Sequence, residues 1–246
     1  MEVRVLGVSA SPRRGNSLFF LKEALAGAGD FPWDVRYTEY DLAGKRLLPC
    51  TSCHHCRTHD GDCGISDDFA ALRQSWVESD VIIYSVPVYH VGVPAQLKAF
   101  FDRLGNSLSG YYGVASGRPL KVIGALVQGC HLFGGQELAA STIIHHAVLM
   151  GSVPVAGDRP ESYIAGAAWT GGDMGRDSLE RLCGEHDRDA EISLRAAASV
   201  VRRSVEMAAL IKSGATVWAE YLRGDPRLHP VLSQLFPPGR EGSGHA

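Results

Sequence analysis

The chain has 246 residues, of which 45% are hydrophobic and 21% are charged, and its formal net charge is −3. It shows no basic excess of the kind that binds nucleic acid, and no long block of like charges. The longest apolar runs, at residues 81–86 and 122–127, have the length of strands and are far too short to span a bilayer. The N-terminus enters a strand-like run at once, without a signal peptide. We therefore expect a cytoplasmic protein with neither a nucleic-acid nor a membrane partner.

The expected elements alternate between strands and helices. Their bounds follow from apolar runs, helical spacing and capping residues. In chain order they are a strand at 3–8, a helix at 18–28, a strand at 34–42, a helix at 66–78, a strand at 80–85, a helix at 95–104, a strand at 121–127, a helix ending at 149, a strand at 151–155 and a helix at 189–212. Beyond these, the sequence predicts a loop at 156–188, one or two further helical turns within 216–236 and a disordered end at 237–246.

This alternation predicts an α/β fold with a doubly wound parallel sheet of five strands. Of the common strand orders for such sheets, 2-1-3-4-5 is the one with five strands. We expect one domain at residues 1–188, with a cysteine-rich loop at 49–64 after the second strand. A helical C-terminal extension at 189–246 is expected to pack on the same domain.

Polar loops follow the first, third and fourth strands, at residues 9–17, 87–93 and 128–137. In this strand order the carboxyl ends of the strands form a crevice where ligands bind, so the three loops should meet there. The loop at 9–17 combines hydroxyls, an amide, an arginine pair and a helix N-terminus, which predicts a phosphate cradle. An ordinary capped turn is the alternative, because neither a dinucleotide fingerprint nor a P-loop is present. We expect a ligand with its phosphate on this loop and a flat group beside the other two.

Four of the six cysteines are crowded into fourteen residues, in the spacing C-x2-C-x2-C-x6-C. They are Cys50, Cys53, Cys56 and Cys63. The first three repeat the run typical of 4Fe-4S ligation. Zinc is the alternative, bound by some of these cysteines with His54, His55 or His59, and metal-free thiols are the third interpretation. Because the loop leaves the second strand beside the first, we expect it close to the rim of the crevice.

The segments 9–17 and 87–103 together resemble the flavodoxin-like NAD(P)H-dependent FMN reductase family, and the cysteine loop between them is similar to that of its iron–sulfur flavoprotein branch. The resemblance covers residues 1–155 and implies FMN as the cofactor. The residues that it implies for the FMN phosphate are Ser9, Ser11, Arg13, Asn16 and Ser17. Those implied for the isoalloxazine ring are Pro87, Val88, Tyr89, His90, Val91 and Gly92, with Gly129, Gly134, Gly135 and Glu137 at its other edge.

The expected function is that of an oxidoreductase in which FMN and a 4Fe-4S cluster exchange electrons. Ferredoxin or NAD(P)H is the expected donor, and a quinone, an oxygen species or a small electrophilic aromatic the acceptor. Tyr89 and His90 are candidates for donating a proton to the acceptor, although plain packing, or a place in the wall of the ring pocket, is the favoured explanation for Tyr89. The alternatives are a flavin-only reductase with a zinc-stapled loop and a non-enzymatic electron carrier. The resemblance also implies a homodimer or homotetramer.

Overall fold

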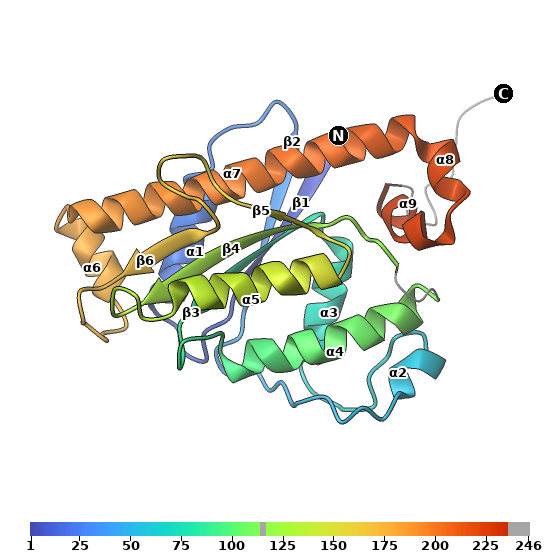
Figure 1. Ribbon diagram of the computed structural model, residues 1–246, viewed down its shortest axis with the longest axis horizontal. Helices are drawn as coiled ribbons and strands as arrows, with labels where there is room; N and C mark the ends of the chain where they lie inside the picture. Colours follow the sequence, from blue (N-terminus) through green and yellow to red (C-terminus); the bar gives the residue numbers. More distant parts are fainter. Residues whose placement is uncertain (114–116, 236–246) are drawn as a thin grey trace.

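The computed structural model describes residues 1–113 and 117–235 of the chain (Figure 1). Its elements, in chain order, are β1 (Glu2–Ser9), α1 (Asn16–Ala26), β2 (Asp34–Asp41), α2 (His55–Thr58), α3 (Phe69–Glu78), β3 (Val81–Pro87), α4 (Ala95–Tyr111), β4 (Val122–Gly129), α5 (Gln136–Leu149), β5 (Val153–Val155), β6 (Gly166–Trp169), α6 (Ser178–Gly184), α7 (Arg188–Val217), α8 (Ala219–Arg223), the 3-10 helix η1 (Pro226–Leu228) and α9 (His229–Leu235). Within the described residues, no helix is both long enough and apolar enough to cross a membrane.

The sheet is parallel, with the order β2-β1-β3-β4-β5, which confirms the predicted fold class. Every residue of β3 and β4 is buried, as expected for central strands covered on both faces. The register places Ser9 beside Asp41 on one side and Ser85 on the other. The carboxyl ends of β1, β2 and β3 therefore lie side by side, and the loops that follow these strands begin at one rim of the sheet.

Two layers of helices cover the sheet (Figure 1). Successive side chains of a strand point to opposite faces, so Ile82 and Tyr84 pack with α3, α4 and α5, whereas Val81 and Ile83 pack with α1 and α7. The long helix α7 belongs to the second of these cores and contributes Val200 among its fully buried residues. The C-terminal helices α8, η1 and α9 form a smaller apolar cluster of their own.

The prediction that residues 156–188 form only a loop was wrong. This segment contains β6, which pairs with the last four residues of β4, and the short helix α6. The sheet therefore has six strands, because β5 and β6 share one edge of β4. A four-residue strand of Gly, Ala, Ala and Trp shows no alternation, so its pairing partner rather than its own pattern makes it a strand.

Several bounds differ from the predictions. Helix α4 continues to Tyr111 and α7 to Val217, and α2 is an unpredicted helical turn inside the cysteine-rich loop. Just before α3, one carboxylate links two segments of the chain. Asp67 accepts hydrogen bonds from the backbone of Phe69 and of Leu48, and its side chain is fully buried. The predicted disordered end at 237–246 lies outside the described residues.

Candidate functional site

The loops after β1, β3 and β4 meet at the carboxyl rim of the sheet, as the sequence predicts. The backbone N–H of Ala10 donates to Ser85 O at 2.8 Å, and that of Val88 donates to Gln128 O at 2.8 Å. The Ser85 hydroxyl also donates to Ser17 O at 2.7 Å, which joins the start of α1 to β3. All fifteen residues implied for FMN therefore lie on segments that begin or end at this one rim.

The segment from Tyr89 to Gly92 is a tight turn. Tyr89 and Gly92 exchange backbone hydrogen bonds of 2.9 and 3.0 Å, and His90 and Val91 between them have φ values of 45° and 65°. Gly135 lies against this turn with a φ of 111°, and a Cβ there would come within 2.5 Å of Val91 Cα. Only glycine combines that dihedral with that close approach, so Gly135 allows the loop after β4 to pack directly against the loop after β3.

Two buried side-chain oxygens at the rim have no hydrogen-bond partner in the part of the chain that the structure describes. Ser9, at the end of β1, is fully buried, and its hydroxyl has no hydrogen-bond partner among the described residues. Gln136, at the start of α5, is 7% exposed, and its Oε1 likewise has no partner there. Buried polar groups are normally satisfied, so a rim with two unsatisfied oxygens fits a polar ligand such as FMN. Sequence reasoning missed Gln136; its place directly after Gly135 was the available signal.

Apolar side chains surround the same rim. Phe133 is 84% exposed and Leu132 is 63% exposed, and Tyr89 and Val91 on the neighbouring turn are also exposed. Exposed aromatic and aliphatic groups beside a polar cradle suit a ligand that is flat and apolar at one end and charged at the other. The residues present therefore fit FMN at both ends.

The cysteine-rich loop starts at this rim and then follows α4 away from it. Gln96, in the first turn of α4, donates to Lys45 O at 2.7 Å, and Arg103 donates to Leu48 O at 3.2 Å. Near the end of α4, a Cβ on Gly110 would lie only 2.0 Å from Cys56 O. The loop is therefore seated along the whole length of the helix.

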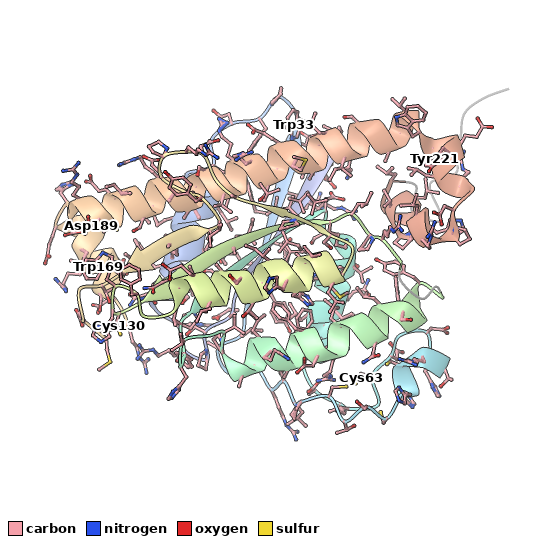
Figure 2. All side chains as sticks on the ribbon, viewed as in Figure 1. Trp33, Cys63, Cys130, Trp169, Asp189 and Tyr221 are labelled. Carbon is pink, nitrogen blue, oxygen red and sulfur yellow. The ribbon has the colours of Figure 1, made fainter. Side chains whose placement is uncertain are left out.

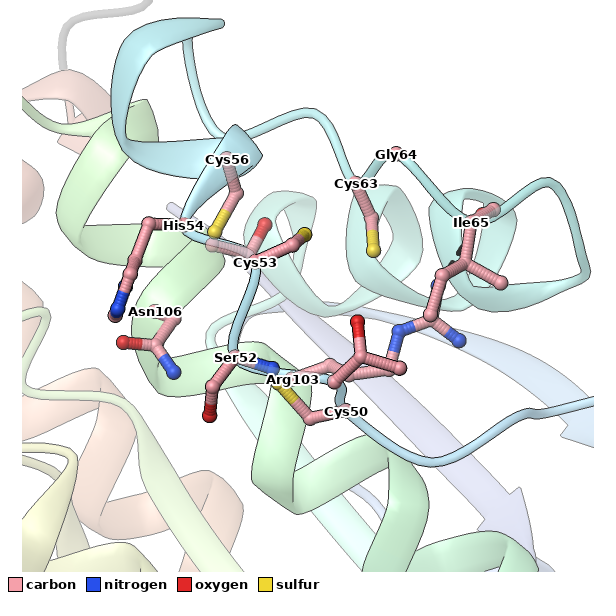
Figure 3. A pocket seen from close by; sticks show the side chains of 12 residues that line it. Cys50, Ser52, Cys53, His54, Cys56, Cys63, Gly64, Ile65, Arg103 and Asn106 are labelled. Carbon is pink, nitrogen blue, oxygen red and sulfur yellow. Dashed lines mark hydrogen bonds between the residues drawn. The ribbon is translucent and has the colours of Figure 1, made fainter.

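All four predicted cysteine ligands line one pocket, which also contains Arg103 (Figure 3). None of the four forms a disulfide. A hydrogen bond from the His55 backbone lowers the pKa of the Cys53 thiol, whereas burial raises the pKa of Cys56. Four thiols facing one space are a donor set that suits a thiolate-bound metal or iron–sulfur group. Within the described residues, no three His, Cys, Asp or Glu side chains already converge as metal ligands, so binding would draw the sulfurs together.

Arg103 is the buried cation of this pocket. Its side chain is 1% exposed and donates to the carboxylate of Asp67, also fully buried, at 2.6 Å. Burial acts to lower the pKa of Arg103, but contacts with Asp67 and the Cys63 thiol outweigh it and raise the pKa. Arg103 ends the segment 87–103 that carries the family resemblance, but it was not predicted as a site residue. Its position three residues after Phe100 places it on the buried face of α4, which was the signal.

The three nearby histidines behave differently from one another. His54 lines the cysteine pocket. His55 and His59 stack on each other with ring centroids 3.7 Å apart, and His59 Nδ1 hydrogen-bonds to His55 O at 3.0 Å. Of the three, only His54 is among the residues that line the pocket.

The pocket lies farther from the rim than expected. An α-helix rises about 1.5 Å per residue, so residues 103–107 lie roughly 12 to 18 Å along α4 from its first turn at the rim. In Figure 2, Cys130, just after β4, is labelled at the left end of the molecule, and Cys63, in the cysteine loop, at its lower right. The expectation that the cysteines cluster close to the rim was wrong, because the loop packs along α4 before the cysteines begin.

Comparison with known proteins identifies the family. The family model described as NADPH-dependent FMN reductase matches residues 3–160. An iron–sulfur flavoprotein of Archaeoglobus fulgidus is 33% identical over 203 residues, covering 82% of this chain and 96% of that relative. A second iron–sulfur flavoprotein, from Methanocaldococcus jannaschii, is 32% identical over 85% of this chain and 100% of its own length. Among solved structures, an NAD(P)H:quinone oxidoreductase from Methanothermobacter marburgensis shares the fold with a TM-score of 0.54 at 19% identity, over 82% of this chain and 96% of that one. The chain thus belongs to the NADPH-dependent FMN reductase family and is an FMN-dependent oxidoreductase.

Proposed function

We propose that this protein passes electrons between FMN and a 4Fe-4S cluster whose ligands are Cys50, Cys53, Cys56 and Cys63. The pocket that these cysteines line together carries the proposal. The buried guanidinium of Arg103, which Asp67 holds in place, contacts the Cys63 thiol and favours its negatively charged thiolate form. The two relatives named iron–sulfur flavoproteins, each covered over nearly its whole length, support the same assignment.

The rim residues supply binding and orientation. Hydroxyls of Ser9, Ser11 and Ser17, with the free backbone N–H groups at the start of α1, would hold the FMN phosphate. The turn from Tyr89 to Gly92 would lie against the flat ring. When bound, FMN exchanges one or two electrons and a cluster exchanges one, so the pair suits a converter between one-electron and two-electron partners.

NAD(P)H or ferredoxin is the proposed donor, and a quinone, an oxygen species or a small electrophilic aromatic is the proposed acceptor. The exposed apolar side chains of Leu132 and Phe133 beside the turn favour a flat, apolar acceptor. Tyr89 and His90 are exposed on that turn and are placed to give a proton to a reduced acceptor.

A flavin-only reductase with zinc in the cysteine loop is the second candidate. The presence of His54 in the pocket favours it, since mixed cysteine and histidine ligands are typical of structural zinc. The stacking of His55 on His59 favours the all-cysteine set of an iron–sulfur cluster.

Anaerobic purification followed by iron, sulfide, zinc and flavin analysis separates these candidates. We expect about four irons and four sulfides per chain, as a 4Fe-4S cluster requires, together with FMN. Replacing Cys53 by Ala should remove the cluster and leave FMN bound, because the cysteine pocket and the rim are separate sites. The control Cys183→Ala, at a lone half-buried cysteine, should change neither. Stoichiometric zinc without iron or sulfide would contradict the cluster, and absence of steady NAD(P)H oxidation with every acceptor would favour a ferredoxin-linked enzyme or a carrier.

A further inference from the structure

The segment of residues 170–179, which runs from the end of β6 into the first turn of α6, is seated on the phosphate loop of residues 9–17. Asn16 uses both polar atoms of its side chain there. Its Nδ2 donates to Gly175 O at 2.9 Å, and its Oδ1 accepts from the backbone N–H of Leu179 at 3.1 Å. Arg13 adds a third bond, from Nη2 to Met174 O at 3.1 Å. Two residues implied as phosphate ligands thus fasten a segment that lies more than 150 positions away in sequence.

The segment, named the cover segment below, is braced internally. The hydroxyl of Thr170 donates to Asp173 O at 2.5 Å, and the Asp173 carboxylate accepts from the backbone N–H of Gly175 and from Arg181, each at 2.8 Å. Its other end reaches the third rim loop, where the Gly172 N–H donates to Cys130 O at 2.6 Å. The cover segment therefore holds its own shape and spans two of the three loops at the rim.

Arg176 lies directly over the start of α1. A Cβ on Gly15 would come within 2.8 Å of Arg176 O and 3.4 Å of Arg176 Cβ, so only a residue without a side chain allows this approach. The Arg176 side chain is exposed, and its guanidinium has no hydrogen bond or ion pair with any described residue. Arg14, by contrast, already pairs with Asp41 at 2.9 Å.

We propose that the cover segment is a wall of the phosphate site, with Asn16 as its positioning residue and Arg176 as a guanidinium that binds the phosphate dianion. The inference rests on the proposed FMN function and assigns the phosphate end of that site. The fully buried, unpartnered hydroxyl of Ser9 at the same loop is the independent sign of a polar ligand. An arginine above a helix N-terminus binds a phosphate by charge-assisted hydrogen bonds in addition to the helix dipole.

Comparison of FMN with riboflavin, which lacks the phosphate, tests the role of Arg176. Fluorescence titration of the full-length apoprotein gives a Kd for each. We expect Arg176→Gln to weaken FMN binding at least about tenfold, the usual scale for a charge-assisted hydrogen bond, and to leave riboflavin binding unchanged. The matched control is Arg188→Gln, another exposed arginine without a partner among the described residues, which should change neither Kd. An equal effect of Arg176→Gln on both flavins, or none on FMN, overturns the inference.

Limited digestion with trypsin, which cuts after Arg176, tests the positioning role of Asn16. We expect bound FMN to slow this cut in the native protein and Asn16→Ala to speed it, with FMN no longer protecting. Asn16→Asp keeps the acceptor for Leu179 and should lie between the two. Unchanged cleavage in Asn16→Ala, with an unchanged ratio of FMN to riboflavin affinity, contradicts the role. If Asn16→Ala does not fold, Arg176→Gln still decides; if the native protein binds neither flavin, the proposed function itself fails.

Discussion

His146 belongs to α5 and packs against α4, with its ring stacked on that of Phe101 at a centroid separation of 3.8 Å. It is 8% exposed, and its Nε2 has no hydrogen-bond partner among the described residues. Burial lowers the pKa of His146 to about 4; the charge of Asp102 acts in the opposite direction and that of Lys98 in the same direction as burial. The folded state therefore favours the neutral form of the His146 ring. The neighbouring residue, His145, is exposed to solvent.

The free energy of unfolding should decrease as the pH is lowered, because of this one residue. The unfolded chain takes up a proton as the pH drops through about 6.5, but folded His146 does so only near pH 4, so the stabilisation is complete above pH 6.5 and is lost between 6.5 and 4. The loss amounts to about 3 kcal/mol at most. In urea unfolding at several pH values, the free energy of unfolding of His146→Leu should depend less on pH between 6.5 and 4 than that of the native protein. His145→Leu, the matched control, should keep the native slope, and equal slopes in all three proteins would refute the assignment.

At the scale of elements, the contact between the cysteine-rich loop and α4 decides where the cysteine pocket lies. Helix α4 presents Arg103 and Ser107 to the loop, and the Ser107 hydroxyl donates to Gly61 O at 2.5 Å. Gly110 completes this surface, because its missing side chain makes room for the backbone of Cys56. The sequence predicted the helix and the loop separately. Their contact joins residues about fifty positions apart, which local patterns do not encode.

Replacing Gly110 by Ala should therefore displace the loop. The new Cβ would meet backbone atoms at 2.0 and 2.9 Å, and backbone cannot move aside as a side-chain tip can. We expect a loss of about 1–3 kcal/mol in the free energy of unfolding, the usual cost of overpacking, together with reduced iron loading. Urea unfolding and metal analysis measure the two effects.

Gly214→Ala in α7 is the matched control, since a Cβ there meets nothing within 4 Å. It should stabilise the protein by about 0.5–1 kcal/mol, because alanine favours a helix interior over glycine. Destabilisation by Gly110→Ala together with stabilisation by Gly214→Ala would support the packing of the loop on α4. Stabilisation by both substitutions would contradict it.

At the scale of the whole molecule, α7 holds the first and last parts of the chain together. Its buried residues, including Ala197, Val200 and Val205, pack in the same core as Val3 and Leu21. Lys212 near its end donates to Glu2 O at 2.8 Å and pairs with the buried Asp80 at 2.9 Å. Residues beyond 188 are thus integral to the face of the sheet that carries α1.

A chain that ends at residue 187 should not fold to a stable monomer. Loss of α7 exposes the apolar face formed by α1 and the sheet, which favours aggregation. A chain that ends at residue 235 retains every described core residue and should keep the native circular-dichroism melting curve. A soluble 1–187 fragment with a cooperative melting transition would show instead that α7 is dispensable for the fold.

Much of this molecule is determined by sequence patterns of short range. Apolar runs bounded by polar turns specify the parallel strands, and the same alternation implies the order β2-β1-β3-β4-β5 and the meeting of three loops at one rim. The spacing of Cys50, Cys53, Cys56 and Cys63 specifies a shared pocket. These features depend on neighbours a few residues apart or on rules of chain crossing, so sequence alone reaches them.

The remaining features were decided by tertiary structure. The strand β6 exists because the free edge of β4 accepts four residues with no strand pattern of their own. The cysteine pocket lies along α4, and Asn16 and Arg13 hold the cover segment, because main-chain groups distant in sequence supply their partners. A side-chain amide or guanidinium binds phosphate and peptide carbonyl alike, so its residue type does not reveal which partner it takes. The folded backbone makes that choice by bringing one carbonyl within hydrogen-bonding distance.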